Sequence, residues 1–240
     1  MQKKIKQIIT KTIARNISYY DTIAGDYNHM MGKEDSNIQV RKLVEAKFRE
    51  IVNKGSILDF GGGTGLDLDW LNEAGYNIIF CEPSVGMRQI AINRWSKDSY
   101  TGNIFFLEGQ QTDFMKWDTA LPFTQKAEGV LANFAVLNCI PNLSLFFDQM
   151  YRILGEEGKV VALILDRHSN KILHLSWLSR IKSFLLQRPL IVDLEHRQQK
   201  QTIYIHSINE IKKASEKNFV FLRTDRLEEY GFTIIYLVRK

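Results

Sequence analysis

Cysteine is scarce in this 240-residue chain, which contains only Cys81 and Cys139. Each lies within an apolar run, and neither is paired with further cysteines at the spacing of zinc ligands. We therefore expect two buried free thiols in a reducing compartment, with neither a disulfide framework nor a metal site.

Long apolar segments are also missing. No window approaches the ~20 apolar residues that a membrane span needs. The basic N-terminus has neither the apolar stretch nor the cleavage site of a signal peptide. These absences predict a soluble, cytoplasmic protein. The net charge of +5 is spread along the chain, with a denser basic segment over 167–200. The charge favours solubility, and we expect no specific nucleic-acid partner.

Strand and helix patterns alternate along most of the chain. Apolar residues at helical spacing predict helices over 38–53, 66–73, 84–95 and 142–153. Apolar runs between them predict strands over 56–60, 77–82, 103–107, 128–133 and 158–165. Strict alternation predicts an α/β fold with a parallel sheet covered on both faces, formed by one domain over 1–240. The last two runs, 218–224 and 232–238, are too close for a crossover helix and should pair antiparallel.

One segment, 166–205, interrupts the alternation. Its apolar residues between 171 and 186 fit one face of an amphipathic helix, with basic residues elsewhere. We predict an inserted helical lid over a substrate, with a membrane-surface contact through 171–188 or a dimer face as alternatives. The sequence leaves open whether the protein is a monomer or a homodimer.

A glycine-rich turn follows the first predicted strand and precedes a predicted helix. Gly61, Gly63 and Gly65 lack Cβ atoms, so a ligand can approach the main chain, and the helix beyond presents free N–H groups. Glu82 ends the next strand, where a carboxylate can accept both ribose hydroxyls of an adenosine. Without the glycine turn, Glu82 would be read as an exposed strand-end carboxylate.

The turn also discriminates between adenosine cofactors. A dinucleotide fingerprint requires a third glycine where Leu66 stands. Asp59 places a carboxylate beneath the turn, which would repel a pyrophosphate but favour the ammonium group of an amino acid. The pattern therefore favours a ligand with a methionine moiety over a dinucleotide.

These residues resemble the class I S-adenosylmethionine-dependent methyltransferases, in the group of small-molecule and ubiquinone/menaquinone-type enzymes. The resemblance covers about 19–165 and is carried by ordered motifs: YDTIAGDY (20–27), ILDFGGGTG (57–65), CEPSVGM (81–87), EGQQ (108–111) with LPF (121–123), AEGVLANF (127–134) and RILGEEG (152–158). It implies a Rossmann-like, doubly wound sheet of seven strands in the order 3-2-1-4-5-7-6, with strand 7 antiparallel. It also implies S-adenosyl-L-methionine as the cofactor.

The resemblance implies a set of cofactor-binding residues. We expect a capping segment over 1–37 with Tyr20 and Tyr27, although both tyrosines also fit ordinary helix packing. Arg41 would pair with the cofactor carboxylate, or else be a solvated helix charge. The remaining expected contacts are Asp59, Gly61, Gly63 and Gly65 at the methionine end, Glu82 at the ribose, Pro83, Met87, Gln110 and Gln111 at the adenine, and Asn133 and Phe134 beside the sulfur.

The chain departs from the family pattern in two places. Gln110 replaces the aspartate that commonly receives the adenine amino group, although an amide oxygen can accept the same hydrogen bond. Asn133, Phe134 and Asn138 stand where quinone-type enzymes often have histidine. This second departure weakens a quinone assignment.

A catalytic base is needed only if the methyl acceptor must lose a proton. His206, near the start of a helix, and His168, after the fifth strand, are the best candidates among five histidines. Each is as well explained by packing or surface exposure.

The sequence thus favours an enzyme that methylates O, N or C of a small, partly apolar molecule. Alternatives are methylation of a membrane-associated lipid or quinone, methylation of RNA or protein, and a cofactor-binding regulatory or partner subunit without catalysis. No amino-methylating motif of the Asn-Pro-Pro-Tyr type follows the fourth strand, which disfavours nucleic acid as the substrate.

Overall fold

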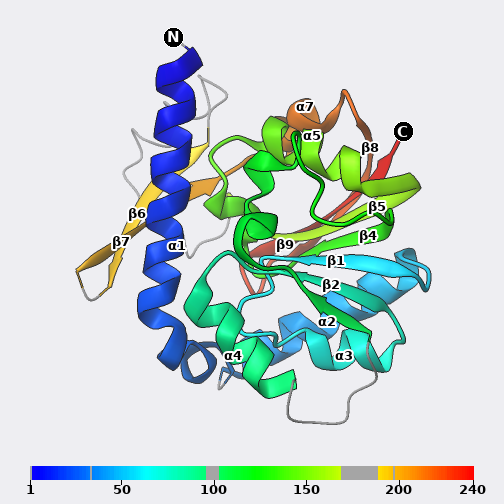
Figure 1. The fold of residues 1–240 in the computed structure, drawn as a ribbon, viewed down its shortest axis with the longest axis horizontal. Helices are drawn as coiled ribbons and strands as arrows, with labels where there is room; N and C mark the ends of the chain where they lie inside the picture. The colour runs from blue at the N-terminus through cyan, green and yellow to red at the C-terminus, as the bar shows by residue number, and fades with distance from the viewer. Residues whose placement is uncertain (1, 33, 96–102, 169–188, 197) are drawn as a thin grey trace.

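The computed structural model describes residues 2–32, 34–95, 103–168, 189–196 and 198–240. A seven-stranded sheet runs through the centre of the molecule, with helices on both of its faces (Figure 1). Its order is β3-β2-β1-β4-β5-β9-β8. The strands are β1 (Ser56–Phe60), β2 (Asn77–Cys81), β3 (Ile104–Phe106), β4 (Ala127–Ala132), β5 (Leu154–Leu165), β8 (Phe219–Leu227) and β9 (Phe232–Arg239).

The pairing confirms the predicted strand order. β1, β2, β3, β4 and β5 pair parallel with their neighbours, whereas β9 pairs antiparallel with both β5 and β8. Because β9 is the seventh strand of the sheet along the chain and β8 the sixth, this is the expected Rossmann-like order 3-2-1-4-5-7-6.

Alternate residues of each inner strand supply the two faces of the sheet. In β1, Ile57 faces the core formed with α2 (Asp35–Ile51), α3 (Leu68–Glu73) and α4 (Val85–Trp95). Leu58 faces the other core, formed with α5 (Leu143–Ile153) and α7 (Ile208–Ser215). The near-continuous apolar sequence of β1 is the pattern of a strand buried on both faces.

Local signals fix where the helices begin. The Asn142 side chain accepts a hydrogen bond from the Leu145 amide at the start of α5. Ser207 and Glu210 form a reciprocal capping box at the start of α7. Such caps satisfy amide groups that have no partner within the helix.

Two elements lie beside the sheet rather than in it. The long helix α1 (Gln2–Gly32) packs along α4 and along an antiparallel pair of strands, β6 (Leu190–His196) and β7 (Gln199–Ile205) (Figure 1). This strand pair differs from the helical insertion expected over 166–205. Alternating β-branched and aromatic residues, such as Ile203, Tyr204 and Ile205, favour strands there. The helix expected over 171–186 and the membrane contact expected over 171–188 lie entirely within 169–188, outside the described residues.

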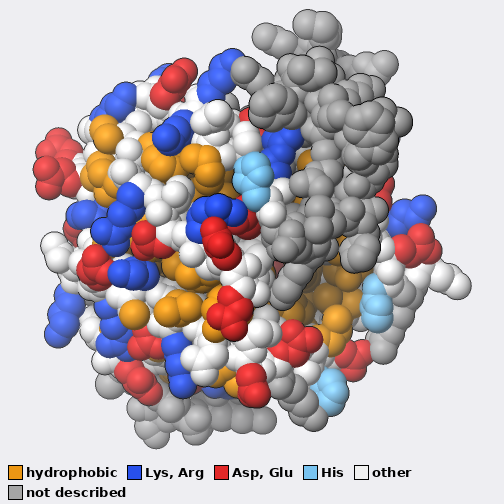
Figure 2. Space-filling view, turned by 180° about the vertical axis from the view of Figure 1, so that it is seen from behind, with side chains coloured by type: hydrophobic (Ala, Val, Ile, Leu, Met, Phe, Trp, Pro, Cys, Tyr) orange, Lys and Arg blue, Asp and Glu red, His pale blue; other side chains and the backbone are white. Residues whose placement is uncertain are grey.

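No helix in the described part of the chain is both long and apolar enough to cross a membrane. On the face in Figure 2, the coloured basic and acidic side chains are interspersed. Among the described residues of that face, the basic side chains therefore form no extended surface of the kind that a nucleic-acid backbone requires.

Candidate active site

The glycine turn lies at the carboxyl end of β1, next to the end of β2. Gly61 donates its amide to the Cys81 carbonyl at 2.7 Å, which joins the two strand ends. Gly63 has φ +60° and a Cβ there would enter open space, 3.9 Å from the nearest atom of Tyr27. Gly65 has φ +77°, but a Cβ there would lie 2.8 Å from Leu68. Gly63 therefore keeps space free for a ligand, whereas Gly65 allows the turn to pack on α3.

Glu82 follows β2 and holds the turn from its other side. Its two carboxylate oxygens accept the amides of Gly63 at 2.9 Å and of Ser84 at 2.7 Å. Burial raises the pKa of Glu82 to about 7, from 4.5 for an ordinary glutamate, although both backbone hydrogen bonds oppose the rise. The carboxyl group is thus poised to change charge near neutral pH.

Asp59 lies beneath the turn and is almost fully buried. Burial, and then the negative charge of Asp67, raises its pKa well above the ordinary value, while Arg41 opposes the rise. Within the described residues its Oδ2 atom has no hydrogen-bond partner. A Cβ on Gly62 would lie 2.5 Å from this oxygen, so the carboxyl group sits directly behind the turn.

Arg41 is a partly buried ion-pair partner rather than a solvated helix charge. Its guanidinium lies 2.5 Å from Asp67 and 4.4 Å from the centre of the Phe134 ring. Asp67 also accepts the Asn133 amide at 3.0 Å and the Trp70 indole at 2.8 Å. α2, the end of β4 and the start of α3 are thereby joined around one carboxylate.

The chain leaves β4 in a strained conformation. Phe134 and Ala135 have φ of +47° and +64°, a region that residues with a Cβ rarely adopt. The Asn133 side chain accepts the Phe134 amide at 2.9 Å, and Ala135 donates its amide to Leu163. Strain of about 1–3 kcal/mol per residue that surrounding contacts maintain is typical of functional sites.

Helix α1 covers the end of β2 and the start of α4. Asp21 accepts the Ser84 hydroxyl at 2.6 Å and the Gly86 amide at 2.9 Å. These bonds place Tyr20 and Tyr27 over the glycine turn, with their rings edge to face at 6.3 Å. Burial raises the pKa of Tyr27 to about 12, so its hydroxyl stays protonated.

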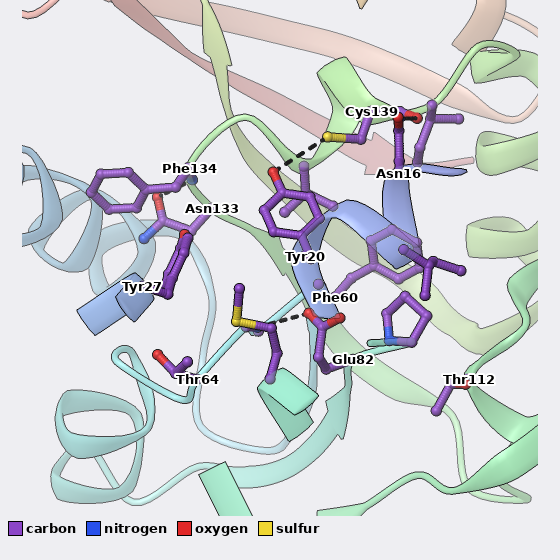
Figure 3. Close-up of a pocket in the computed structure, with 18 of the residues that line it drawn as sticks. Asn16, Tyr20, Tyr27, Phe60, Thr64, Glu82, Thr112, Asn133, Phe134 and Cys139 are labelled. Atoms are coloured by element: carbon purple, nitrogen blue, oxygen red, sulfur yellow. Dashed lines mark hydrogen bonds between the residues drawn. The ribbon is translucent and has the colours of Figure 1, made fainter. Parts of the chain in front are cut away.

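These elements enclose a cavity of about 270 Å³ (Figure 3). Around the glycine turn and the strand ends it is lined by Tyr27, Arg41, Phe60, Gly61, Gly62, Gly63, Thr64, Leu66, Asp67, Glu82, Pro83, Met87, Thr112, Asp113, Phe114, Asn133 and Phe134. Toward α1 and the short helix η3 (Val136–Cys139) it is lined by Ile13, Asn16, Ile17, Tyr20, Val136, Cys139 and Ile140. The cavity therefore joins a polar glycine turn to an apolar wall.

A family model described as a methyltransferase domain matches residues 34–219. The chain belongs to this methyltransferase domain family. No curated protein matches it in sequence.

Solved structures share the fold of this methyltransferase-domain protein. The DhpI–SAM–HEP complex has a TM-score of 0.70 over 95% of this chain and 98% of its own, at 15% identity. The glycopeptide N-methyltransferase MtfA complexed with (S)-adenosyl-L-methionine has a TM-score of 0.59 over 82% and 86%, at 11% identity. At such identities the likeness establishes the fold alone.

Most of the residues expected at the site of this methyltransferase domain line the cavity. They are Tyr20, Tyr27, Arg41, Gly61, Gly63, Glu82, Pro83, Met87, Asn133 and Phe134. Asp59 and Gly65 are not among its lining residues: Asp59 supports the turn from behind, and Gly65 packs against α3.

Gln110 and Gln111 are also outside the cavity lining of the methyltransferase domain. Both belong to the short helix η1 (Gly109–Thr112) and are exposed. The Gln111 side chain donates to the Pro122 carbonyl at 3.0 Å and helps to cap η1. The turn of η1 instead brings Asp113 to the cavity, which sequence reasoning missed because it sought an acid at position 110.

Neither histidine lies at the cavity. His206 is buried behind η3, where Nε2 lies 3.1 Å from the Ile140 carbonyl. Burial lowers its pKa, which favours the neutral ring. His168 is exposed beyond β5, and its backbone amide bonds to Asp166. The apolar wall from α1 and η3 was missed as well, because no local pattern links two segments so far apart in the chain.

Proposed function

We propose that this protein transfers a methyl group from S-adenosyl-L-methionine to an O, N or C atom of a small, partly apolar molecule. The strongest support is the pairing of Glu82 with the glycine turn at one wall of the cavity. A carboxylate beside ligand-accessible backbone is suited to the ribose hydroxyls of an adenosine.

The residues present fit this cofactor. Oδ2 of Asp59, which has no hydrogen-bond partner among the described residues, and the nearby Asp67 can accept hydrogen bonds from an ammonium group, and Arg41 supplies a cation for a carboxylate. Met87 and Pro83 give the cavity an apolar wall for a base, with Asp113 as an acceptor for its amino group.

When bound, S-adenosyl-L-methionine supplies an activated methyl group on a positively charged sulfur. The protein then has to align an acceptor with this group and exclude water, which alone can lower a barrier by roughly 7–11 kcal/mol. Tyr20, Tyr27 and Phe60 surround the cavity with aromatic rings, whose faces favour positive charge. Because His206 and His168 lie away from the cavity, the proposed mechanism assigns neither of them the role of base.

Calorimetric titration tests the proposal. We expect S-adenosyl-L-methionine and S-adenosylhomocysteine to bind with one site per chain, and NAD not to bind. Binding of NAD with no response to either sulfur compound would refute the assignment. Release of S-adenosylhomocysteine during incubation with candidate acceptors then separates an enzyme from a regulatory binding protein.

A further inference from the structure

The cavity has two ends of different character. Its charged lining residues lie around the glycine turn and the loop after β3: Arg41, Asp67, Glu82 and Asp113. The opposite end, which we call the α1 end, is lined by Ile13, Asn16, Ile17, Tyr20, Val136, Cys139 and Ile140. Within the described parts of the chain, no charged side chain lines the α1 end. Figure 3 shows three of its residues, Asn16, Tyr20 and Cys139.

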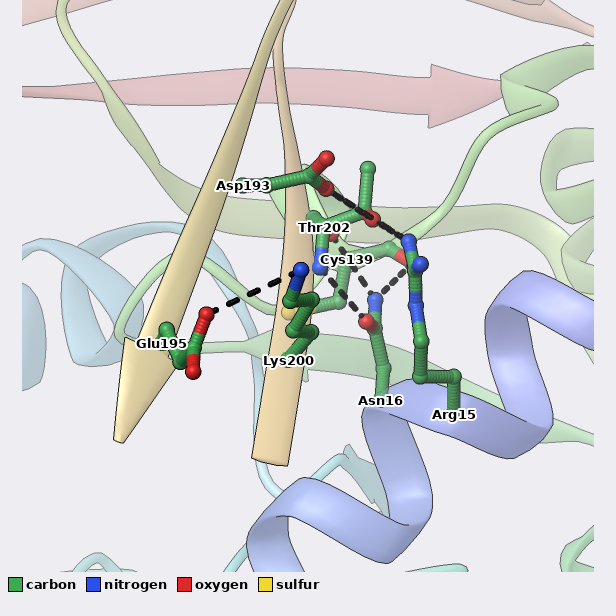
Figure 4. A network of polar contacts seen from close by, with 7 residues as sticks. All are labelled: Arg15, Asn16, Cys139, Asp193, Glu195, Lys200 and Thr202. Atoms are coloured by element: carbon green, nitrogen blue, oxygen red, sulfur yellow. Dashed lines mark hydrogen bonds and ion pairs between the residues drawn. The ribbon is translucent and has the colours of Figure 1, made fainter. Parts of the chain in front are cut away.

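The amide hydrogens of Asn16 are already engaged at the α1 end. Nδ2 donates to the Thr202 carbonyl at 2.9 Å and to the Cys139 carbonyl at 3.2 Å. Oδ1 accepts the Thr202 amide at 2.9 Å. Figure 4 shows this residue between β7 and η3, with the neighbouring Arg15 bonded to Thr202. Asn16 therefore fixes the wall in place rather than donating to a ligand.

Tyr20 is held differently. Gln201, a buried residue of β7, donates its amide to the Tyr20 oxygen at 2.8 Å and to the Cys139 sulfur at 3.4 Å. Because the oxygen accepts from Gln201, the hydroxyl proton is free to point elsewhere. Its neighbour in this structure is the Cys139 sulfur at 3.7 Å, and a thiol is only a weak acceptor. A ligand oxygen would be a better one.

The polar groups of the α1 end stay uncharged at neutral pH. Burial raises the pKa of Tyr20 well above its ordinary value and raises that of Cys139 as well. An ionised ligand group would find no counter-charge among these side chains, and burying an unpaired charge is far more costly than burying a hydrogen-bonded neutral group.

We propose that the α1 end binds the methyl acceptor, and that the acceptor is a neutral, largely apolar molecule whose oxygen accepts a hydrogen bond from the Tyr20 hydroxyl. Gln201 is a positioning residue that orients this hydroxyl. The inference rests on the proposed function, because it takes the glycine-turn end to be the cofactor site.

The test uses the full chain saturated with S-adenosylhomocysteine and ring compounds matched in size. The compounds form four sets, called arms, and each arm contains a benzene-sized and a naphthalene-sized ring. The rings carry no polar group in the hydrocarbon arm, a hydroxyl in the hydroxyl arm, and a carboxylate or an alkylammonium group in the two ionised arms. Calorimetry measures the affinity of each. We expect the hydroxyl arm to bind most tightly, the hydrocarbon arm about fivefold more weakly, as for loss of one neutral hydrogen bond, and neither ionised arm to bind detectably.

Variants identify the groups responsible. Tyr20→Phe should weaken the hydroxyl arm about fivefold and leave the hydrocarbon arm unchanged, because the ring that lines the cavity is kept. Gln201→Met should reduce the same hydroxyl-to-hydrocarbon ratio by a smaller factor. Tyr19→Phe is the matched control, because Tyr19 is the buried neighbour of Tyr20 and is not a lining residue. A merely structural defect would weaken both arms together.

Three results overturn the proposal: tightest binding of an ionised arm, no binding of the hydroxyl arm at millimolar concentration, or a hydroxyl preference that survives Tyr20→Phe. Failure of S-adenosylhomocysteine to bind the unmodified protein would instead refute the proposed function. The two failures are therefore distinguishable.

Discussion

Replacing Glu82 with glutamine removes the negative charge beside Gly63 and keeps the size of the side chain. If Glu82 accepts the ribose hydroxyls, each hydrogen bond to its charged group contributes about 1.5–3 kcal/mol. Loss of one such bond corresponds to a 10- to 100-fold weaker affinity for S-adenosyl-L-methionine. Glu128→Gln is a matched control, because Glu128 is exposed on β4 and is not a lining residue.

The pH dependence gives an independent test of Glu82. Its pKa of about 7 means that the carboxyl group is mostly protonated at pH 6 and mostly ionised at pH 8. If the ionised form binds the ribose, affinity should rise about tenfold between these values. Calorimetry in buffers of different ionisation enthalpy should detect proton release on binding at pH 6.5. Glu82→Gln should abolish both effects, and a variant that keeps the pH dependence would refute the ribose assignment.

Glu82 should affect stability in the opposite direction, because a rise in pH that strengthens cofactor binding should lower the free energy of unfolding. The folded pKa of Glu82 is raised above its ordinary 4.5, so its contribution is fully present below pH 4.5 and is lost as pH rises through 7. The difference between these values corresponds to roughly 3 kcal/mol. Urea unfolding at pH 5 and pH 8 should show the unmodified protein losing stability relative to Glu82→Gln by up to about this amount. An equal change in both proteins would contradict the raised pKa.

Further substitutions test the glycine turn, Arg41 and the two histidines. Gly63→Ala places a Cβ in the cavity and should abolish cofactor binding, whereas Gly75→Ala, with a similar positive φ and open surroundings, should cost only about 1 kcal/mol of stability and leave binding intact. Arg41→Gln should weaken binding of S-adenosylhomocysteine about tenfold but not that of 5′-methylthioadenosine, which lacks the carboxylate; equal weakening of both would contradict the pairing. His206→Asn should lower the melting temperature without altering the pH profile of turnover, and His168→Ala should change neither. The His206 contribution to stability should be present above about pH 6.5 and lost as pH falls below it, because burial lowers its pKa.

The central sheet was predictable because its signals are local. Strand and helix periods, the glycine turn and the short gap before β9 each lie within a few residues of one another. Together they predicted a parallel sheet that ends in an antiparallel pair, and the resemblance to the methyltransferase family supplied the strand order that the structure confirms. Glu82 was found for the same reason, since it directly follows a buried strand.

The far wall of the cavity was not predictable, because it depends on long-range contacts. Asn16 forms a hydrogen bond with Thr202, 186 residues away, and the sequence of neither segment alone predicts this contact. The arrival of Asp113 at the cavity likewise depends on how η1 turns, which sequence spacing does not define. The strands β6 and β7 were obscured by the basic, amphipathic segment that precedes them.

The hydrogen bonds between α1 and β7 limit how the preference for a methyl acceptor can be transferred from one such protein to another. Helix α1 precedes the segment that the family model matches, and β7 lies outside the central sheet. The hydrogen bonds between Asn16 and Thr202 nevertheless join α1 and β7 into one structural unit, although the two elements are far apart in the sequence. A chimera that takes α1 from one protein and β7 from another would lose these hydrogen bonds at the cavity wall. A preference for one methyl acceptor should therefore be transferred to another protein only when α1 and β7 are exchanged together. The same two segments should change together among relatives that differ in acceptor preference.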